Sequence, residues 1–337
     1  MKFVSIFLII TLFCLNLKAQ ESTEQRLSNL ENIVSKLPRI MGDVNLRYRY
    51  DDTDDANSFD VRRVRLDFRG NVAEAWSYRL HFDFASAPNN PPKILDVFIN
   101  WKINDYVALQ AGQYKIPFSL ENSYNPNNLE MIDNSLAISR LVGYSDVSGI
   151  NANGRDIGVG FIGSFFKKEG YNLLNYSVGI FNGSGINTAG DTNRNKDFSG
   201  TISVNPVRYL TLALSHYNGM AGDKDNTFQR LRSGFGVKYD DNRLLVRSEY
   251  IHGKTSDFKS EGAYSVFGYY VHPKFQPVAR YDYFKRDLSD KNTLQQNHTV
   301  GFNYFPANNV RLQFNYTYRT AHESDSNYIV TQLWVKF

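Results

Sequence analysis

The feature that most constrains the fold is an alternation of apolar and polar residues, which recurs in about sixteen segments after residue 40. In the first segment, Asp43 to Tyr50, valine, leucine and tyrosine alternate with asparagine and arginine. Successive side chains of a β-strand point to opposite faces, so each segment is expected to form a strand with one apolar and one polar face. A chain with this pattern along nearly its whole length is predicted to be all-β.

The composition places these strands in a membrane. Aromatic residues make up 15% of the chain, yet no segment after the first twenty residues is apolar enough for a membrane helix. In a transmembrane barrel only alternate residues face lipid, and tyrosine and phenylalanine collect at the membrane interfaces. Short and longer connections also alternate, a rhythm that a soluble sandwich has no reason to keep. We predict a transmembrane antiparallel β-barrel of about sixteen strands over residues 41–337.

The first residues have the pattern of an export signal. Lys2 is followed by an apolar run and by the small residue Ala19. The run is shorter than the roughly twenty residues that cross a bilayer, so we predict a signal peptide over residues 1–19. Its removal takes away the only cysteine, Cys14, together with two lysines and no acids, which lowers the formal charge from +4 to +2. Such a small charge gives no indication of a nucleic-acid partner.

Residues 20–40 have a different period from the rest of the chain. Apolar residues recur there at spacings of three and four, which indicates a short helix that ends before Pro38. Two interpretations stay open. The segment forms a periplasmic coiled coil below a trimeric barrel, or it is a frayed leader, because so few heptads are marginal for a free helix. The apolar stripe consists of Leu27, Leu30, Val34 and Leu37.

A long irregular segment interrupts the strands. Gly112 to Gly149 opens with GQYKIPFSLE and then has neither strand nor helix periodicity. A structureless segment of this length within a compact domain needs a functional explanation. In a closed barrel, one loop can fold into the lumen, where water satisfies backbone groups that lipid would leave unpaired. We predict that this segment folds inward as a constriction loop.

Three motifs carry a family resemblance. GQYKIPF, the arginine-rich strand VRRVRLDFRG and the turn FNGSG resemble the phosphate-selective porin O and P family of bacterial outer membranes, over nearly the whole chain after residue 40. The resemblance implies a trimeric outer-membrane porin, surrounded by membrane lipid and lipopolysaccharide, that passes small anionic or hydrophilic solutes without a cofactor. The last strand ends on Phe337 and resembles the signal that the barrel assembly machinery recognises.

The resemblance and the residues together predict an ion preference. In the family, inner-wall arginines and lysines near the constriction are thought to guide phosphate. Here the loop also carries Glu121, Glu130, Asp133 and Asp146, which are expected to face the arginines and to create a transverse field. Because wall cations outnumber loop acids, we expect a weak to moderate anion preference, with phosphate selectivity left open. The predicted pore residues are Lys115, Arg47, Arg49, Arg63, Arg65, Arg69, Arg79 and Arg140.

A calcium site is a weaker candidate. The stretch GDTNRNKD places oxygen-bearing side chains at alternate positions, as in the first half of a calcium-binding loop. It lacks the glycine and the bidentate glutamate of such loops, since Lys196 and Ile202 stand there. A solvated turn is the favoured interpretation, and otherwise no metal is expected. The four candidate ligands are Asp191, Asn193, Asn195 and Asp197.

Two other functions remain as alternatives to a porin. A structural or adhesin barrel would act through its external loops, with the lumen plugged. A barrel hydrolase would need a catalytic group assembled from different strands, but the six histidines are scattered singly and no HExxH or Gly-x-Ser-x-Gly motif is present. We therefore expect no enzymatic activity.

Overall fold

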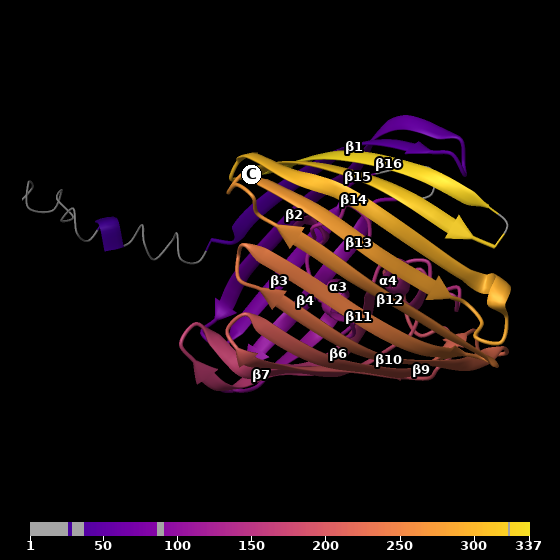
Figure 1. Ribbon diagram of the computed structural model, residues 1–337. Helices are drawn as coiled ribbons and strands as arrows, with labels where there is room; N and C mark the ends of the chain where they lie inside the picture. Colours follow the sequence, from indigo (N-terminus) through magenta and orange to yellow (C-terminus); the bar gives the residue numbers. More distant parts are fainter. Residues whose placement is uncertain (1–25, 29–36, 86–90, 323) are drawn as a thin grey trace, which may run out of the picture.

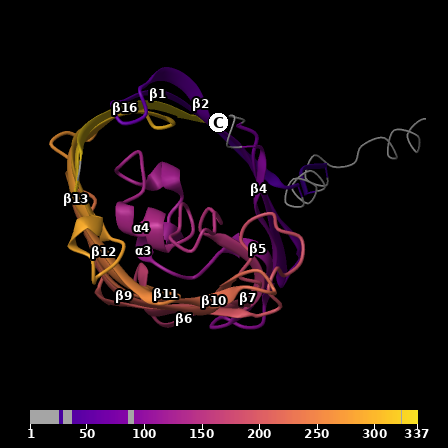
Figure 2. The same cartoon turned by 90° about the vertical axis from the view of Figure 1, so that its right-hand side faces the viewer.

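The structure is a computed structural model that describes residues 26–28, 37–85, 91–322 and 324–337. Within these residues, sixteen antiparallel strands form one closed barrel, in which each strand pairs with its neighbours in sequence and β1 pairs with β16 (Figures 1 and 2). The predicted class and strand number are confirmed. The strands are β1 Arg39–Asp51, β2 Ala56–Ala73, β3 Trp76–Asp83, β4 Lys93–Lys102, β5 Ala108–Lys115, β6 Arg155–Lys168, β7 Tyr171–Phe181, β8 Asp197–Val207, β9 Leu210–Gly222, β10 Thr227–Asp240, β11 Leu244–Thr255, β12 Phe258–Tyr269, β13 Phe275–Lys285, β14 Leu294–Ala307, β15 Val310–Ala321 and β16 Asp325–Lys336.

The alternation of the sequence becomes the two faces of the barrel wall. On β1, Asn45 is buried inside and bonds to the side chain of Asn127, whereas Leu46 is 47% exposed on the outer face. Because the sheet closes on itself, no strand edge is left unpaired. We call the end that carries Arg39 and Phe337 the turn end, and the opposite end the loop end. The described helices are all too short or too polar to traverse a bilayer.

Some predicted boundaries differ from the observed ones. β1 begins at Arg39, two residues before the predicted start of the barrel at residue 41 and within the segment 20–40. Of that segment, residues 26–28 are helical, and most of the rest lies outside the described residues, as does the predicted signal peptide 1–19. From Gly253 to Glu261 the sequence shows no clear alternation and would be taken for a longer connection, yet β11 and β12 continue through this stretch and leave a two-residue turn. Polar side chains on the outer face mask the strand period there, while backbone pairing continues.

The segment between β5 and β6, residues 116–154, lies inside the barrel as predicted (Figure 2). It contains two short helices and one 3-10 turn and approaches the wall at β11, β12 and β13. Serine side chains cap both helices, Ser119 before α3 and Ser135 before α4. These elements are α3 Leu120–Ser123, η1 Pro126–Asn128 and α4 Leu136–Leu141. α4 therefore lies against one side of the barrel, while other parts of the loop reach β1 and β2.

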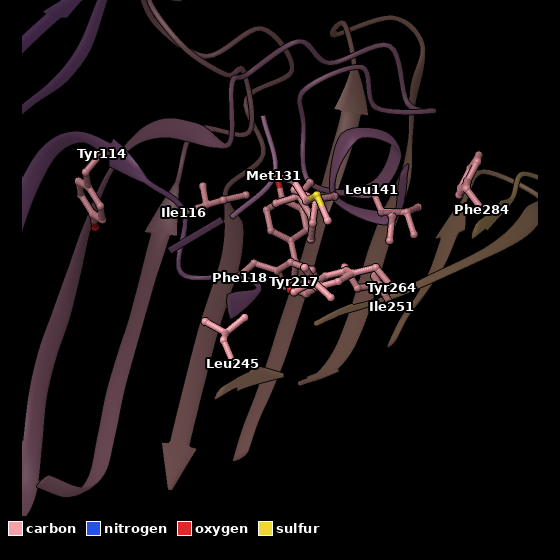
Figure 3. Packing of buried hydrophobic residues seen from close by; sticks show 14 of the residues in the cluster. Tyr114, Ile116, Phe118, Met131, Leu141, Tyr217, Leu245, Ile251, Tyr264 and Phe284 are labelled. Carbon is pink, nitrogen blue, oxygen red and sulfur yellow. The ribbon is translucent and has the colours of Figure 1, made fainter. Parts of the chain in front are cut away.

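Apolar contacts hold this constriction loop to the wall (Figure 3). Phe118, Ile138 and Leu141 of the loop belong to one buried cluster with Ile251 of β11 and Val266 of β12. Each fully buried side chain of this size contributes about 1.5–3 kcal/mol relative to exposure. The loop is thus packed like a core element rather than suspended in the lumen.

Glycines of the inner wall let the loop come close. A Cβ atom on Gly236 would lie 2.8 Å from the Leu120 side chain, and one on Gly262 would lie 2.9 Å from Ala137 Cβ. Both distances are shorter than side-chain carbon contacts allow. Glycine at these two positions therefore leaves the space in which α3 and α4 pack directly against the wall backbone.

Candidate pore and constriction loop

The acidic residues of the constriction loop fasten it to wall arginines. Asp146 is fully buried and accepts hydrogen bonds from Arg230 on one oxygen and from Arg232 on the other, both at 3.0 Å. Both arginine side chains are at most 3% exposed. Charge-assisted bonds of this kind are stronger than neutral ones, and burial raises the cost of breaking them.

A wall carboxylate binds the start of α3. Glu249 of β11 accepts the backbone amide protons of Leu120 at 2.7 Å and Glu121 at 2.9 Å, and also the Ser119 hydroxyl at 3.0 Å. The Tyr264 hydroxyl donates to the same carboxylate at 2.6 Å. Helix N-termini leave backbone amides unpaired and favour a negative charge. Glu249 therefore fixes both the position and the direction of α3.

The remaining loop acids are also bound. Glu130 pairs with Arg247 at 2.7 Å, and Asp133 pairs with Arg62 at 2.5 Å. Glu121 is 3% exposed and accepts the amide of Ser135 at 2.8 Å. The expected row of free loop carboxylates facing the arginine wall is not formed. Burying a loop in the lumen requires partners for its charges, so the acids serve as anchors instead.

Open space remains in the lumen along β1 and β2. A cavity of about 630 Å³ at the loop end shares Arg47, Arg62 and Asn134 with a middle cavity of about 350 Å³. The middle cavity shares Pro126 with a cavity of about 420 Å³ at the turn end. These adjacent cavities form a path between the loop and the arginine-rich strands.

Cations outnumber carboxylates along this path. The middle cavity is lined by five cationic side chains and two carboxylates. The cavities at the loop end and at the turn end have the same kind of excess. The charged residues of the middle cavity are Arg47, Arg62, Arg63, Arg65, Lys93, Asp60 and Asp83.

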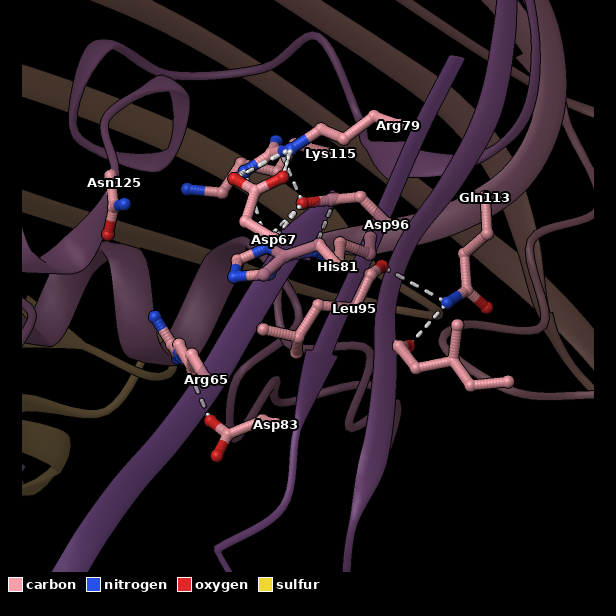
Figure 4. A network of polar contacts seen from close by, with 12 residues as sticks. Arg65, Asp67, Arg79, His81, Asp83, Leu95, Asp96, Gln113, Lys115 and Asn125 are labelled. Carbon is pink, nitrogen blue, oxygen red and sulfur yellow. Dashed lines mark hydrogen bonds and ion pairs between the residues drawn. The ribbon is translucent and has the colours of Figure 1, made fainter. Parts of the chain in front are cut away.

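Most of the predicted wall arginines are paired with aspartates of the same wall. Arg65 bonds to Asp83 at 2.9 Å, and both Arg69 and Arg79 bond to Asp67 at 2.8 Å (Figure 4). The other pairs are Arg47 with Asp60, Arg49 with Asp54, Arg79 with Asp96 and Arg155 with Asp96. Pairing holds the guanidinium groups in fixed orientations and reduces the net charge that each one contributes.

Three predicted arginines keep capacity for an anion. In the described part of the chain, Arg63 has no carboxylate partner and donates only to Asn127 Oδ1, at 3.4 Å. Arg65 is 5% exposed, and its Nη1 atom has no hydrogen-bond partner there. Arg140 lines the cavity at the loop end, where no described carboxylate pairs with its side chain. An anion beside Arg63 and Arg65 would supply the missing acceptors.

Comparison with known proteins agrees with this arrangement. The sequence profile of the phosphate-selective porin O and P family matches residues 38–233 and 236–332. The chain belongs to this family. It is therefore an outer-membrane porin, and the turn end and loop end correspond to the periplasmic and external sides. The family and the solved structures similar to it are channels rather than enzymes.

Solved structures share the fold at low sequence identity. An anion-selective porin from Comamonas acidovorans is 12% identical with a TM-score of 0.69, covering 89% of this chain and 99% of that chain. The trimer form of OmpT from Vibrio cholerae is 11% identical with a TM-score of 0.64, covering 89% and 99%. An uncharacterised protein of Aquifex aeolicus is 19% identical over 396 residues, covering 94% of this chain and 91% of that protein.

Sequence reasoning placed one pore arginine on the wrong face of its strand. The pairing of β1 with β2 shifts register between Asn45, opposite Arg63, and Leu46, opposite Val61. Arg62 is the extra residue of this β-bulge, and it points inward beside Arg63, where it binds Asp133 and the Ile132 carbonyl. Strict alternation placed Arg62 on the lipid face. Two consecutive arginines, one of which alternation would place on the lipid face, are the sequence signal that could have revealed the bulge.

Lys115 has a different role from the one predicted for it. Its ammonium group donates to the carbonyls of Asn122, at 2.6 Å, and Tyr124. These carbonyls lie at the C-terminal end of α3, so the lysine ties the start of the constriction loop to β5. Lys115 still lines the periplasmic cavity of this porin, but its donors are engaged by the loop.

The calcium candidates do not converge. Asp191 bonds to Lys196 and to the amides of its own turn; burial alone would raise the pKa of this carboxyl, but these donors hold it below its usual value. Asp197 instead bonds to the Tyr217 hydroxyl and the Met220 amide. Asn193 accepts the Asn195 backbone amide and donates to the Met220 carbonyl. Among the described residues, no group of three or more acidic, histidine or cysteine side chains is placed to hold a metal.

Proposed function

We propose that this porin is a passive diffusion channel for small hydrophilic solutes that prefers anions. The observation that supports the proposal most directly is the middle cavity, where five cations face two carboxylates. Arg63 lies there without a carboxylate partner in the described chain. A narrow path beside unpaired guanidinium groups concentrates anions and repels cations.

The anchoring of the loop strengthens this preference. Glu130, Asp133 and Asp146 are each bound to an arginine, so they add little negative field to the path. The transverse field expected from the sequence is weaker than in a channel with free loop acids. We therefore propose a moderate anion preference rather than a nearly neutral one.

Phosphate is one candidate among the anions. Arg63 and Arg65 lie two residues apart on one strand and both line the middle cavity. Guanidinium groups bind phosphate oxygens two at a time. Similarity of fold to the anion-selective porin of Comamonas acidovorans supports a preference for anions but not for a particular ion. We propose anion preference as the function and treat phosphate as the first ion to test.

Replacing Arg63 with alanine is expected to lower the anion-to-cation permeability ratio roughly threefold or more, because a unit charge about 4 Å from an ion is worth about 1 kcal/mol in water. The measurement is the reversal potential of single channels in a potassium chloride gradient, repeated with potassium phosphate. The double variant Arg63→Ala, Arg65→Ala should shift the reversal potential further in the same direction. Arg208→Ala serves as a control, because Arg208 lies in a turn and stacks on Tyr209. A wild-type preference for cations, or an unchanged reversal potential in the double variant, would show that this pore assignment is wrong.

We propose that the porin is a homotrimer, as the resemblance implies and as the trimer form of OmpT supports by similarity of fold. Deleting residues 20–36 is expected to leave the barrel intact and to shift the population toward monomers, if their apolar stripe forms a coiled coil. Native mass spectrometry in detergent measures the shift. An unchanged trimer would mean that the segment is a tether and not a coiled coil that holds the trimer together.

We also propose that outer-membrane lipid, including lipopolysaccharide, surrounds the barrel, and that the assembly machinery binds the last strand. Leu333 and Val335 alternate along the outer face of β16, and Phe337 follows them. The Phe337 side chain covers Gly42 of β1, so the proposed recognition residue lies at the seam where the barrel closes.

A further inference from the structure

Three lysines gather on the outer face of β11, β12 and β13, which lie side by side at the external end of the barrel (Figure 1). Lys254 of β11 lies directly opposite Lys259 of β12, and Glu261 of β12 lies opposite Lys285 of β13. The neighbouring residues Ser260 and Phe284 are buried on the inner side, at 0% and 2% exposure. Alternation therefore points the lysines outward, and we call them the lysine patch.

The lysine patch lies at the height of the external membrane surface. Lys254 and Lys259 flank the two-residue turn between β11 and β12. Ten residue steps separate Lys254 from Leu244, the first residue of β11. At a rise of about 3.3 Å per residue and a strand tilt of about 40°, this corresponds to about 25 Å along the barrel axis. The apolar band of such barrels is also about 25 Å tall.

The charges of the lysine patch are not neutralised within the described chain. Lys254 and Lys259 have no ion pair or hydrogen bond through their side chains there, and Lys285 donates to the Leu288 carbonyl at 3.1 Å. The nearby acids Asp257 and Glu261 form no ion pair among the described residues, and Glu261 accepts from Tyr250 at 2.9 Å. Like charges opposite each other destabilise a sheet. Among the described strands, no other two lysines are paired in this way. A bound anion would remove the repulsion.

Farther from the strand ends than the lysine patch, a small side chain lies between two aromatic ones on the outer face. Ala263 of β12 lies between Tyr250 of β11 and Tyr283 of β13 in the register of the sheet. All three point outward, and Tyr250 is 41% exposed. The Ala263 methyl group is much smaller than the tyrosine side chains that flank it in the register, and we call this low point of the outer face the groove.

We propose that the lysine patch and this groove bind one phosphorylated lipid of the outer leaflet. The lysines contact the phosphate, and an acyl chain lies over Ala263 between the two tyrosines. The proposal rests on the outer-membrane location of the chain and is independent of its ion preference. Polybasic sites gain about 1 kcal/mol per lysine near anionic headgroups, and every 1.4 kcal/mol is tenfold in affinity.

Native mass spectrometry of the full chain in detergent, with diphosphorylated lipid A as the probe, tests the proposal. The variant Lys254→Gln, Lys259→Gln, Lys285→Gln is expected to bind at least about tenfold more weakly. Dephosphorylated lipid A should bind the wild type as weakly. The control Lys102→Gln, Lys167→Gln, Lys168→Gln removes three lysines at the periplasmic end and should bind normally.

A second variant tests the groove. Ala263→Trp keeps all three lysines and fills the space between the tyrosines, and it should also lose the lipid. It can be tested even if the triple lysine variant does not fold. Lipid binding as strong as that of the wild type in both variants would overturn the proposal. Displacement of lipid A by a low concentration of inorganic phosphate would show that the site binds free phosphate rather than a lipid. Loss of the oligomer with lipid binding unchanged would instead assign the surface to a second copy of the chain.

Discussion

Replacing Asp146 with alanine is expected to release the end of the constriction loop and to raise the single-channel conductance. The substitution leaves Arg230 and Arg232 buried without their carboxylate. Removing one partner of a buried pair costs about 3–5 kcal/mol. The barrel wall keeps its backbone pairing, so the cost falls on the contact between loop and wall. The freed end of the loop then moves out of the lumen and widens the path.

Planar bilayer recording measures this effect as a larger mean current step and increased current noise. Asp191→Ala is the matched control, because Asp191 pairs with Lys196 in an external loop and its hydrogen bonds within the described chain go to that same loop. A conductance for Asp146→Ala equal to that of the wild type and of the control would mean that this anchor does not set the channel width.

Replacing Gly262 with valine is expected to lower the conductance instead. A Cβ atom there would lie 2.9 Å from Ala137 Cβ and 3.0 Å from Ala137 Cα. The wall side of this contact is a paired strand, so α4 must yield and move toward the open path. Overpacking of this kind costs about 1–3 kcal/mol. The channel narrows because the loop is displaced rather than released.

Ala263→Val is the control for this variant, because Ala263 is the next residue and points to the outer face. Both variants should retain the heat-modifiable gel mobility of a closed barrel, which separates misfolding from narrowing. If Gly262→Val conducts as well as Ala263→Val, the inner-wall glycines do not determine how closely the loop lies to the wall. A higher conductance for Asp146→Ala together with a lower conductance for Gly262→Val would show that the position of the loop determines the pore size.

The sequence predicted much of this architecture, because a barrel wall is a local pattern. Alternation over successive segments indicated the strand number and the face of most residues, including Arg47, Arg65 and Arg79. The pattern failed at Arg62, where a bulge inserts one residue and turns an expected lipid-facing arginine into the lumen. Alternation by itself does not show where the partner strand omits a residue, and the Arg62–Arg63 doublet is the local sign of it.

By itself, the sequence determined the closed antiparallel barrel, the inward loop and the supply of arginines, since each depends on the period or composition of short segments. Only the tertiary structure decided which charges remain open to solutes. Asp146 and Glu130 meet arginines from strands about a hundred residues away, Lys115 meets loop carbonyls, and Arg63 meets no described carboxylate. These pairings depend on how the loop lies against the wall. A buried charge must find a partner wherever packing places it, and that position is a property of the folded chain.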